Sequence, residues 1–96
     1  MKEIKLFSLV GAFAENKDVA REIRLQKIIP ELEKGQEVAL NFEKIDSVTQ
    51  SFIHALISDL IRKYGNRVLD RVYFKHCNET VQKIINIVVD YMQESD

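Results

Sequence analysis

The sequence has little of several residue types, and each shortage excludes a class of structure. It holds one cysteine, so it can form no disulfide within the chain and no metal site built from several cysteines. Only three glycines and one proline are present, which argues against long loops, disorder and collagen-like repeats. No stretch approaches the roughly 20 consecutive apolar residues of a membrane span. These shortages together predict an ordinary soluble globular protein.

The charge balance and the N-terminal segment exclude further classes. The formal net charge is −1, from 14 basic and 15 acidic residues. A nucleic-acid-binding protein depends on many contacts to phosphates, so we expect no nucleic-acid partner. Residues 1–18 contain no apolar run long enough for a signal peptide and no small-residue cleavage site. We therefore expect a cytoplasmic protein without a membrane partner, folded as one domain over residues 1–96.

The apolar residues are spaced for strands and helices in alternation. Apolar runs predict strands over Ile4–Val10, Val38–Phe42 and part of Val68–His76. Apolar positions three and four residues apart predict three helices: from Asp18 to about Lys34, from the turn at Ser51 to Tyr64, and from Asn78 to about Gln93, followed by a polar end at residues 94–96.

The ends of these helices carry recognisable signals. Asp18 and Asn78 are the expected N-caps of the first and last helices, because short polar side chains accept hydrogen bonds from free N–H groups there. Pro30 lies inside the first helical pattern, where a proline costs about 3 kcal/mol. We therefore expect a kink or a break near Ile29, and Gly35 is expected to end the helix.

The pattern of the strands predicts how the helices are arranged. Strands joined by helices run parallel, with right-handed connections. The second and third strands each have one apolar face and one mixed face, whereas a parallel sheet covered on both sides has continuous apolar strands. We therefore expect a single-domain α/β fold of order βαβαβα, with a small, mostly parallel sheet and helices mainly on one face. Seven residues are expected on the open face: Lys5, Phe7, Ala39, Asn41, Arg71, Tyr73 and Lys75.

The densest group of hydroxyl and amide side chains lies in the turn between the second strand and the second helix, residues 46–51. Ser47 and Gln50 have the spacing of a capping box, which is a purely structural interpretation. The functional interpretation rests on position, because sites in open α/β sheets form beyond the carboxyl ends of the strands. A helix N-terminus there also offers free N–H groups to an anion. Both interpretations remain open at this point.

Other candidate residues form weaker patterns. His54 and His76 have no carboxylate or cysteine at ligand spacing, so we expect neither a metal nor another cofactor. Cys77 lacks an orienting third residue and a glycine-rich oxyanion turn, which indicates a buried structural cysteine and no enzyme. Five basic residues are interpreted as a solvated face or a surface for an acidic partner: Arg62, Lys63, Arg67, Arg71 and Lys75. The apolar excess of the last helix is either core or a dimer contact: Ile87, Val89 and Tyr91.

The stretch LNFEKIDSVTQSFIHALI, residues 40–57, resembles the central signature of STAS domains, the sulfate transporter and anti-sigma-factor antagonist family. In that family, a strand leads through a short apolar turn into Asp-Ser-Ser-Gly and a Leu-rich helix. Aligned on the strand, Thr49 replaces the Asp, and Gln50 replaces the serine that partner kinases phosphorylate. Ser51 then matches the second serine, and Phe52 replaces the glycine. The sequence is most similar to the small stand-alone STAS-like domains of unknown function, in which a Thr/Ser-x-Ser-Phe turn replaces this motif.

The resemblance implies a non-catalytic protein-interaction or regulatory module. Its partner would be another protein, for example a kinase-like ATPase of the anti-sigma type, docking around five residues of the turn: Asp46, Ser47, Thr49, Gln50 and Ser51. Because glutamine cannot be phosphorylated, Thr49 and Ser51 are the remaining candidate phospho-acceptors. The alternative is a domain that binds a small ligand or an anion at the N-terminus of the second helix. We expect a monomer or a weak homodimer.

Overall fold

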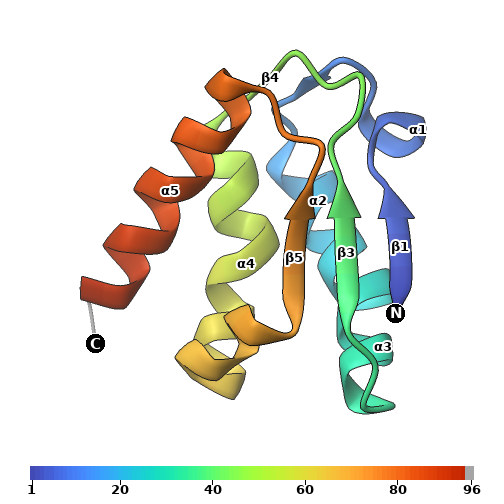
Figure 1. Ribbon diagram of the computed structural model, residues 1–96, viewed down its shortest axis with the longest axis vertical. Helices are drawn as coiled ribbons and strands as arrows, with labels where there is room; N and C mark the ends of the chain where they lie inside the picture. Colours follow the sequence, from blue (N-terminus) through green and yellow to red (C-terminus); the bar gives the residue numbers. More distant parts are fainter. Residues whose placement is uncertain (95–96) are drawn as a thin grey trace.

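The computed structural model describes residues 1–94, in which strands and helices alternate (Figure 1). The strands are β1 (Lys2–Lys5), β2 (Phe13–Ala14), β3 (Val38–Asn41), β4 (Ser47–Val48) and β5 (Val72–Lys75). The helices are α1 (Phe7–Val10), α2 (Lys17–Ile23), the π-helical η1 (Arg24–Ile28), α3 (Ile29–Glu33), α4 (Gln50–Tyr64), the 3₁₀-helical η2 (Asn66–Asp70) and α5 (Glu79–Glu94). Most of the expected polar end, residues 95–96, lies outside the described part of the chain.

The main sheet has three parallel strands in the order β1-β3-β5. Both crossovers advance in the same direction across the sheet, so right-handed connections place their helices on the same face. Figure 1 shows α2 and α4 behind the sheet, and α5 packs against α4. The predicted α/β fold, with a small parallel sheet and helices on one face, is confirmed.

One hydrophobic core fills the space between the sheet and the helices. Leu40 lies between Ile4 and Phe74 in the register of the three strands, and its side chain is fully buried. From α4, Phe52 and Leu56 are also fully buried, one helical turn apart. The apolar stripe predicted for α4 therefore faces the core. The opposite side of its first turns lies at the surface.

The open face of the sheet differs from the expected one at two positions. Glu3, Ala39 and Tyr73 form one row across the strands, and Lys5, Asn41 and Lys75 form the next. The prediction was wrong for Phe7, which lies in α1 and packs partly against the core. It was also wrong for Arg71, which precedes β5 and donates hydrogen bonds to the carbonyl oxygens of Leu32 and Gln36.

The first strand is shorter than predicted. β1 ends at Lys5, and the chain continues as the helical turn α1 instead of remaining extended to Val10. Leu6 is already in the helical region, and its carbonyl oxygen accepts hydrogen bonds from the N–H groups of Leu9 and Val10. The partner strand β3 ends at Asn41, so little remains for a longer strand to pair with.

The first long helical segment begins earlier than predicted and contains a π-helical turn. Asn16, not Asp18, is the N-cap, because its side-chain oxygen accepts from the N–H groups of Asp18 and Val19. The interruption expected near Ile29 is the π-helical η1, after which Pro30 sits in the first turn of α3. Gly35 ends the helix as predicted, with a φ of 84° that suits glycine.

The third strand lies within the predicted range Val68–His76. β5 spans Val72–Lys75, and the residues before it form the 3₁₀-helical η2. The last helix starts as expected, since the side-chain oxygen of Asn78 accepts from the N–H of Val81 at 2.8 Å. The structure further contains a two-stranded parallel sheet, β2 with β4, that was not predicted.

Candidate functional site

The polar turn before α4 is fixed to the rest of the fold from two sides. On one side, β4 pairs with β2, and the N–H of Thr49 donates to the carbonyl oxygen of Ala14 at 3.0 Å. On the other side, the Asn78 side-chain amide donates to the carbonyl oxygens of Ile45 and Asp46, at 3.2 and 2.9 Å. The turn therefore presents its side chains from a fixed backbone.

The five predicted site residues have three different roles. Thr49 is the N-cap of α4, with its hydroxyl accepting from the N–H of Phe52 at 3.0 Å. The predicted capping box was therefore wrong, because Ser47 is half-buried in β4. Asp46 is exposed next to Asn78. Gln50 and Ser51 are exposed in the first turn of α4.

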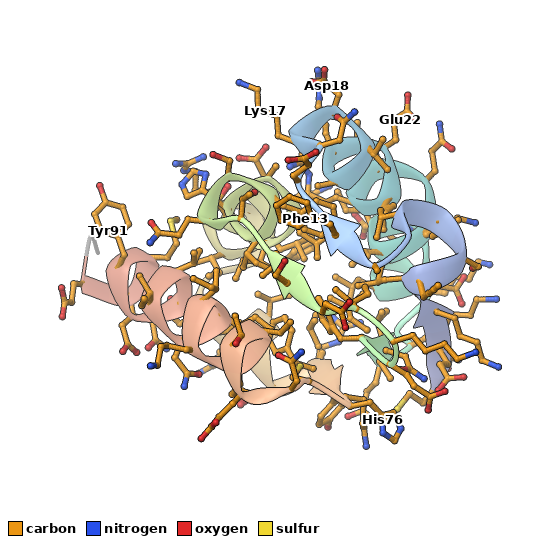
Figure 2. All side chains as sticks on the ribbon, turned by 90° about the horizontal axis from the view of Figure 1, so that it is seen from above. Phe13, Lys17, Asp18, Glu22, His76 and Tyr91 are labelled. Atoms are coloured by element: carbon orange, nitrogen blue, oxygen red, sulfur yellow. The ribbon has the colours of Figure 1, made fainter. Side chains whose placement is uncertain are left out.

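Gln50 and Ser51 line one end of a surface groove of about 460 Å³, the α4–α5 groove. Figure 2 shows Lys17 of α2 and Tyr91 of α5 on either side of α4. The complete lining combines polar and apolar side chains: Lys17, Gln50, Ser51, His54, Ala55, Ile87, Val88 and Tyr91. The structure thus joins the predicted turn to two of the three apolar residues singled out on the last helix, Ile87 and Tyr91.

A second, shallower hollow of about 400 Å³, the α2–α4 hollow, lies alongside this groove. Its lining includes Arg24, only 6% exposed, whose side chain contacts Asp59 at 3.1 Å and donates to the carbonyl oxygen of Ala55. Sequence reasoning missed this arginine. The available signal was the spacing of Lys17, Arg21 and Arg24, which places three basic residues on one helix face.

The other candidate residues do not assemble into a site. Burial raises the pKa of the half-buried Cys77 thiol to about 11, which disfavours a reactive thiolate. His76 is exposed, and no group of three or more His, Cys, Asp or Glu residues within 1–94 is placed to hold a metal ion. Two of the basic residues predicted to form one face have separate partners, since Lys63, in the last turn of α4, pairs with Glu33, and Arg71 donates to backbone carbonyl oxygens.

The described helices include none that is long and apolar enough to span a membrane. No curated protein and no solved structure matches the chain significantly. A family model does match: the STAS-like domain of unknown function (DUF4325), over residues 20–82. The matched region runs from α2 to the first turn of α5 and so contains the turn, the whole of α4 and most of the α2–α4 hollow. Together with the one-sided parallel sheet, this match shows that the chain belongs to the family of STAS-like domains of unknown function.

Proposed function

We propose that this STAS-like domain is a non-catalytic interaction module that docks a partner protein through the Asp46–Ser51 turn and the first turns of α4. The observation that carries this proposal is the α4–α5 groove, where exposed polar residues of the turn adjoin exposed apolar residues of α5. Ile87 is 45% exposed although it is a large apolar residue. Apolar contact area with a polar rim is typical of protein-binding surfaces.

The fixed backbone of the turn supports this proposal. A binding surface whose conformation is already set loses less entropy on association than a flexible one. The pairing of β2 with β4 and the hydrogen bonds from Asn78 set that conformation here. The family resemblance suggests a kinase-like ATPase of the anti-sigma type as the partner.

Ser51 is the better candidate phospho-acceptor of the two hydroxyl residues. Its side chain is exposed at the second position of α4, whereas the Thr49 hydroxyl is engaged as the helix cap. A phosphate at the first turn of a helix is stabilised by the helix dipole, and it would add nearly two negative charges to the groove. Lys17 lines the same groove and supplies an opposite charge.

The proposal is tested by comparing the partners captured by wild-type protein, Ser51→Glu and Gln50→Lys. Ser8→Glu is the control, because Ser8 is an exposed serine on α1 outside the groove. We expect at least one partner, identified by mass spectrometry, to bind the wild type and the control but not the groove variants. If all four proteins capture the same set, the turn is not the docking site.

Phosphorylation is tested separately with a purified kinase-like ATPase and radiolabelled ATP. We expect label on the wild type and Thr49→Ser, and none on Ser51→Ala. Label that persists in Ser51→Ala would assign the modification elsewhere and leave the docking proposal to the capture experiment.

A second candidate function is anion binding at the N-terminus of α4. The presence of Lys17 and His54 in the groove favours it. However, one of the first-turn N–H groups is already occupied, because the Thr49 hydroxyl accepts from the N–H of Phe52. Titration of the amide resonances of Gln50 and Ser51 with inorganic phosphate distinguishes this candidate from protein docking.

A further inference from the structure

The α2–α4 hollow concentrates positive charge in a protein that has no overall surplus of it. Four basic residues line it, namely Lys17, Arg21, Arg24 and Arg62, against two acidic residues, Asp18 and Asp59. The complete chain has a formal net charge of −1. The surplus is therefore local, and it lies farther along α2 and α4 than the turn used in the proposed function.

The basic residues come from two helices that face one another. Lys17, Arg21 and Arg24 follow at steps of four and three residues, which places them on one helix face. His54 and Arg62 lie eight residues apart on α4, on the side that meets α2. Neither helix alone would form the hollow, because each supplies one wall.

One carboxylate holds two of the four basic groups. Asp59 contacts Arg24 at 3.1 Å and Arg62 at 2.8 Å, so it sets the positions of both guanidinium groups. Lys17 and Arg21 form no ion pair within the described part of the chain. The hollow thus contains one buried, held guanidinium group (Arg24), one exposed guanidinium group paired with Asp59 (Arg62), and two cations without an ion pair in the described residues, against one further carboxylate, Asp18.

A row of basic residues on a helix is commonly a solvated surface, but Arg24 differs from such residues. Its side chain is 7% exposed, and its Nε–H group is buried without a hydrogen-bond acceptor in the described residues. Buried donors in folded proteins are nearly always paired, so an exception needs an explanation. An oxyanion bound in the hollow would bring the missing negative charge to this guanidinium group, whose Nε–H has no acceptor of its own in the described residues.

We propose that the α2–α4 hollow binds a small phosphorylated compound that carries two neighbouring phosphate groups. Guanidinium groups recognise phosphate through paired, charge-assisted hydrogen bonds, and arginine fits this geometry better than lysine. A volume of about 400 Å³ falls within the range of small-molecule sites, so it accommodates more than one phosphate group. Lys17, Arg21 and Arg62 provide exposed positive charge, while Arg24 provides a guanidinium group held by Asp59 and the carbonyl oxygen of Ala55.

Inorganic pyrophosphate is the ligand for the test, with inorganic phosphate and sodium chloride of equal ionic strength as comparisons. Binding is followed by two-dimensional ¹H–¹⁵N NMR, which detects both the backbone amides and the Nε–H groups of the arginines. We expect saturable shifts of the Arg24 Nε–H signal and of amides in α2 and α4, stronger with pyrophosphate than with phosphate. Sodium chloride should not reproduce them.

Arg21→Gln and the control Arg67→Gln remove the same charge from exposed positions, but only Arg21 lines the hollow. Loss of one charge-assisted contact predicts that Arg21→Gln weakens pyrophosphate binding about tenfold or more, with little effect of Arg67→Gln. The NMR spectrum of each variant shows directly whether it is folded.

Three outcomes would overturn the proposal: no saturable shift, equal effects of the two arginine substitutions, or shifts confined to Gln50 and Ser51. The last outcome would place the anion at the N-terminus of α4 instead. The first two outcomes leave the docking proposal unchanged, because its test is the capture of a protein partner, whereas the third would favour the second candidate function, anion binding at the turn.

Discussion

The side chain of Asn78 connects the turn before α4 to the start of α5. Its amide donates to the carbonyl oxygen of Asp46 at 2.9 Å, while its oxygen accepts from the N–H of Val81 at 2.8 Å. One residue therefore caps a helix and holds the candidate docking turn, so the two roles can be separated by substitution.

Asn78→Asp should keep the cap and lose the connection, whereas Asn78→Ala should lose both. Aspartate is as good an N-cap as asparagine, but it cannot donate to the carbonyl oxygens of Ile45 and Asp46. We expect Asn78→Ala to lower the free energy of unfolding by about 2 kcal/mol. Urea unfolding measures this, and faster hydrogen exchange at the turn amides in both variants would show the lost connection. Unchanged exchange in Asn78→Asp would contradict this role.

Thr49→Ala should destabilise the protein more than Ser51→Ala. The Thr49 hydroxyl caps α4, and loss of such a cap costs about 1 kcal/mol, while Ser51 is exposed in the first turn. Thermal unfolding of the two variants gives the comparison. Equal melting temperatures would mean that the cap contributes nothing to stability.

Asp59→Asn should destabilise the protein more than Arg62→Gln, because it breaks both ion pairs of Asp59, whereas Arg62→Gln breaks only one of them. The side chain of Arg24 is 7% exposed and that of Arg62 is 60% exposed, so only Arg24 is left buried without its counter-charge. Because Asp59 itself is half-exposed, we expect a loss of about 1–2 kcal/mol for Asp59→Asn and less than about 0.5 kcal/mol for Arg62→Gln. Urea unfolding of both variants measures the difference, and reversal of the order would contradict the assignment.

Cys77 should react slowly with alkylating reagents in the folded protein. Burial raises its pKa from 9.0 to about 11, and the thiolate is the reactive form. At pH 8, the folded protein should therefore react about 100-fold more slowly than the urea-unfolded protein. Because the folded pKa is raised, the thiol favours folding below pH 9, and this contribution is lost as the pH rises toward 11. Iodoacetamide labelling followed by mass spectrometry measures the rates.

Glu33 should stabilise the folded protein at neutral pH but not in acid. Hydrogen bonds from Tyr64, at 2.9 Å, and from Lys63 lower the pKa of its carboxyl group from the ordinary value of 4.5. A lowered folded pKa means that the contribution is present above pH 4.5 and disappears as the pH falls through the folded value. Wild type should therefore exceed Glu33→Gln in stability at pH 7, and the two should converge in acid. Glu22→Gln, at an exposed site on α2 (Figure 2), is the control for unfolding between pH 3 and pH 7.

The long periodic elements could be predicted from the sequence because their pattern and their packing agree. The buried residues of α4 match its apolar stripe, and β3 lies where alternation places it. Residues 7–10 were misassigned because a short apolar run reads equally well as a strand or a helical turn. β2 and β4 have two residues each, which is too short for any periodic pattern.

The details of the candidate sites depend on contacts between distant parts of the chain. Ser47 and Thr49 are both good capping residues, and the pairing of Ser47 with Phe13 leaves the cap to Thr49. Asn16 and Asp18 presented the same ambiguity two residues apart. The basic stripe of α2 was visible in the sequence, but the α2–α4 hollow also requires the opposite wall from α4, which local patterns do not indicate.

The π-helical η1 amounts to a one-residue insertion in a helix, with a consequence for how relatives should be compared. Each residue of an α-helix turns the chain by about 100°, so a relative with one residue fewer between Arg24 and Ile28 would carry Lys17 and Arg21 around the helix by that angle relative to α3. The same rotation would turn Ala20 and Ile23, the buried residues of α2, so a relative of that length would need its apolar and its basic residues at other positions of the helix. Within the family, the length of this single turn should therefore distinguish members whose α2 places basic residues in the α2–α4 hollow from members whose α2 does not.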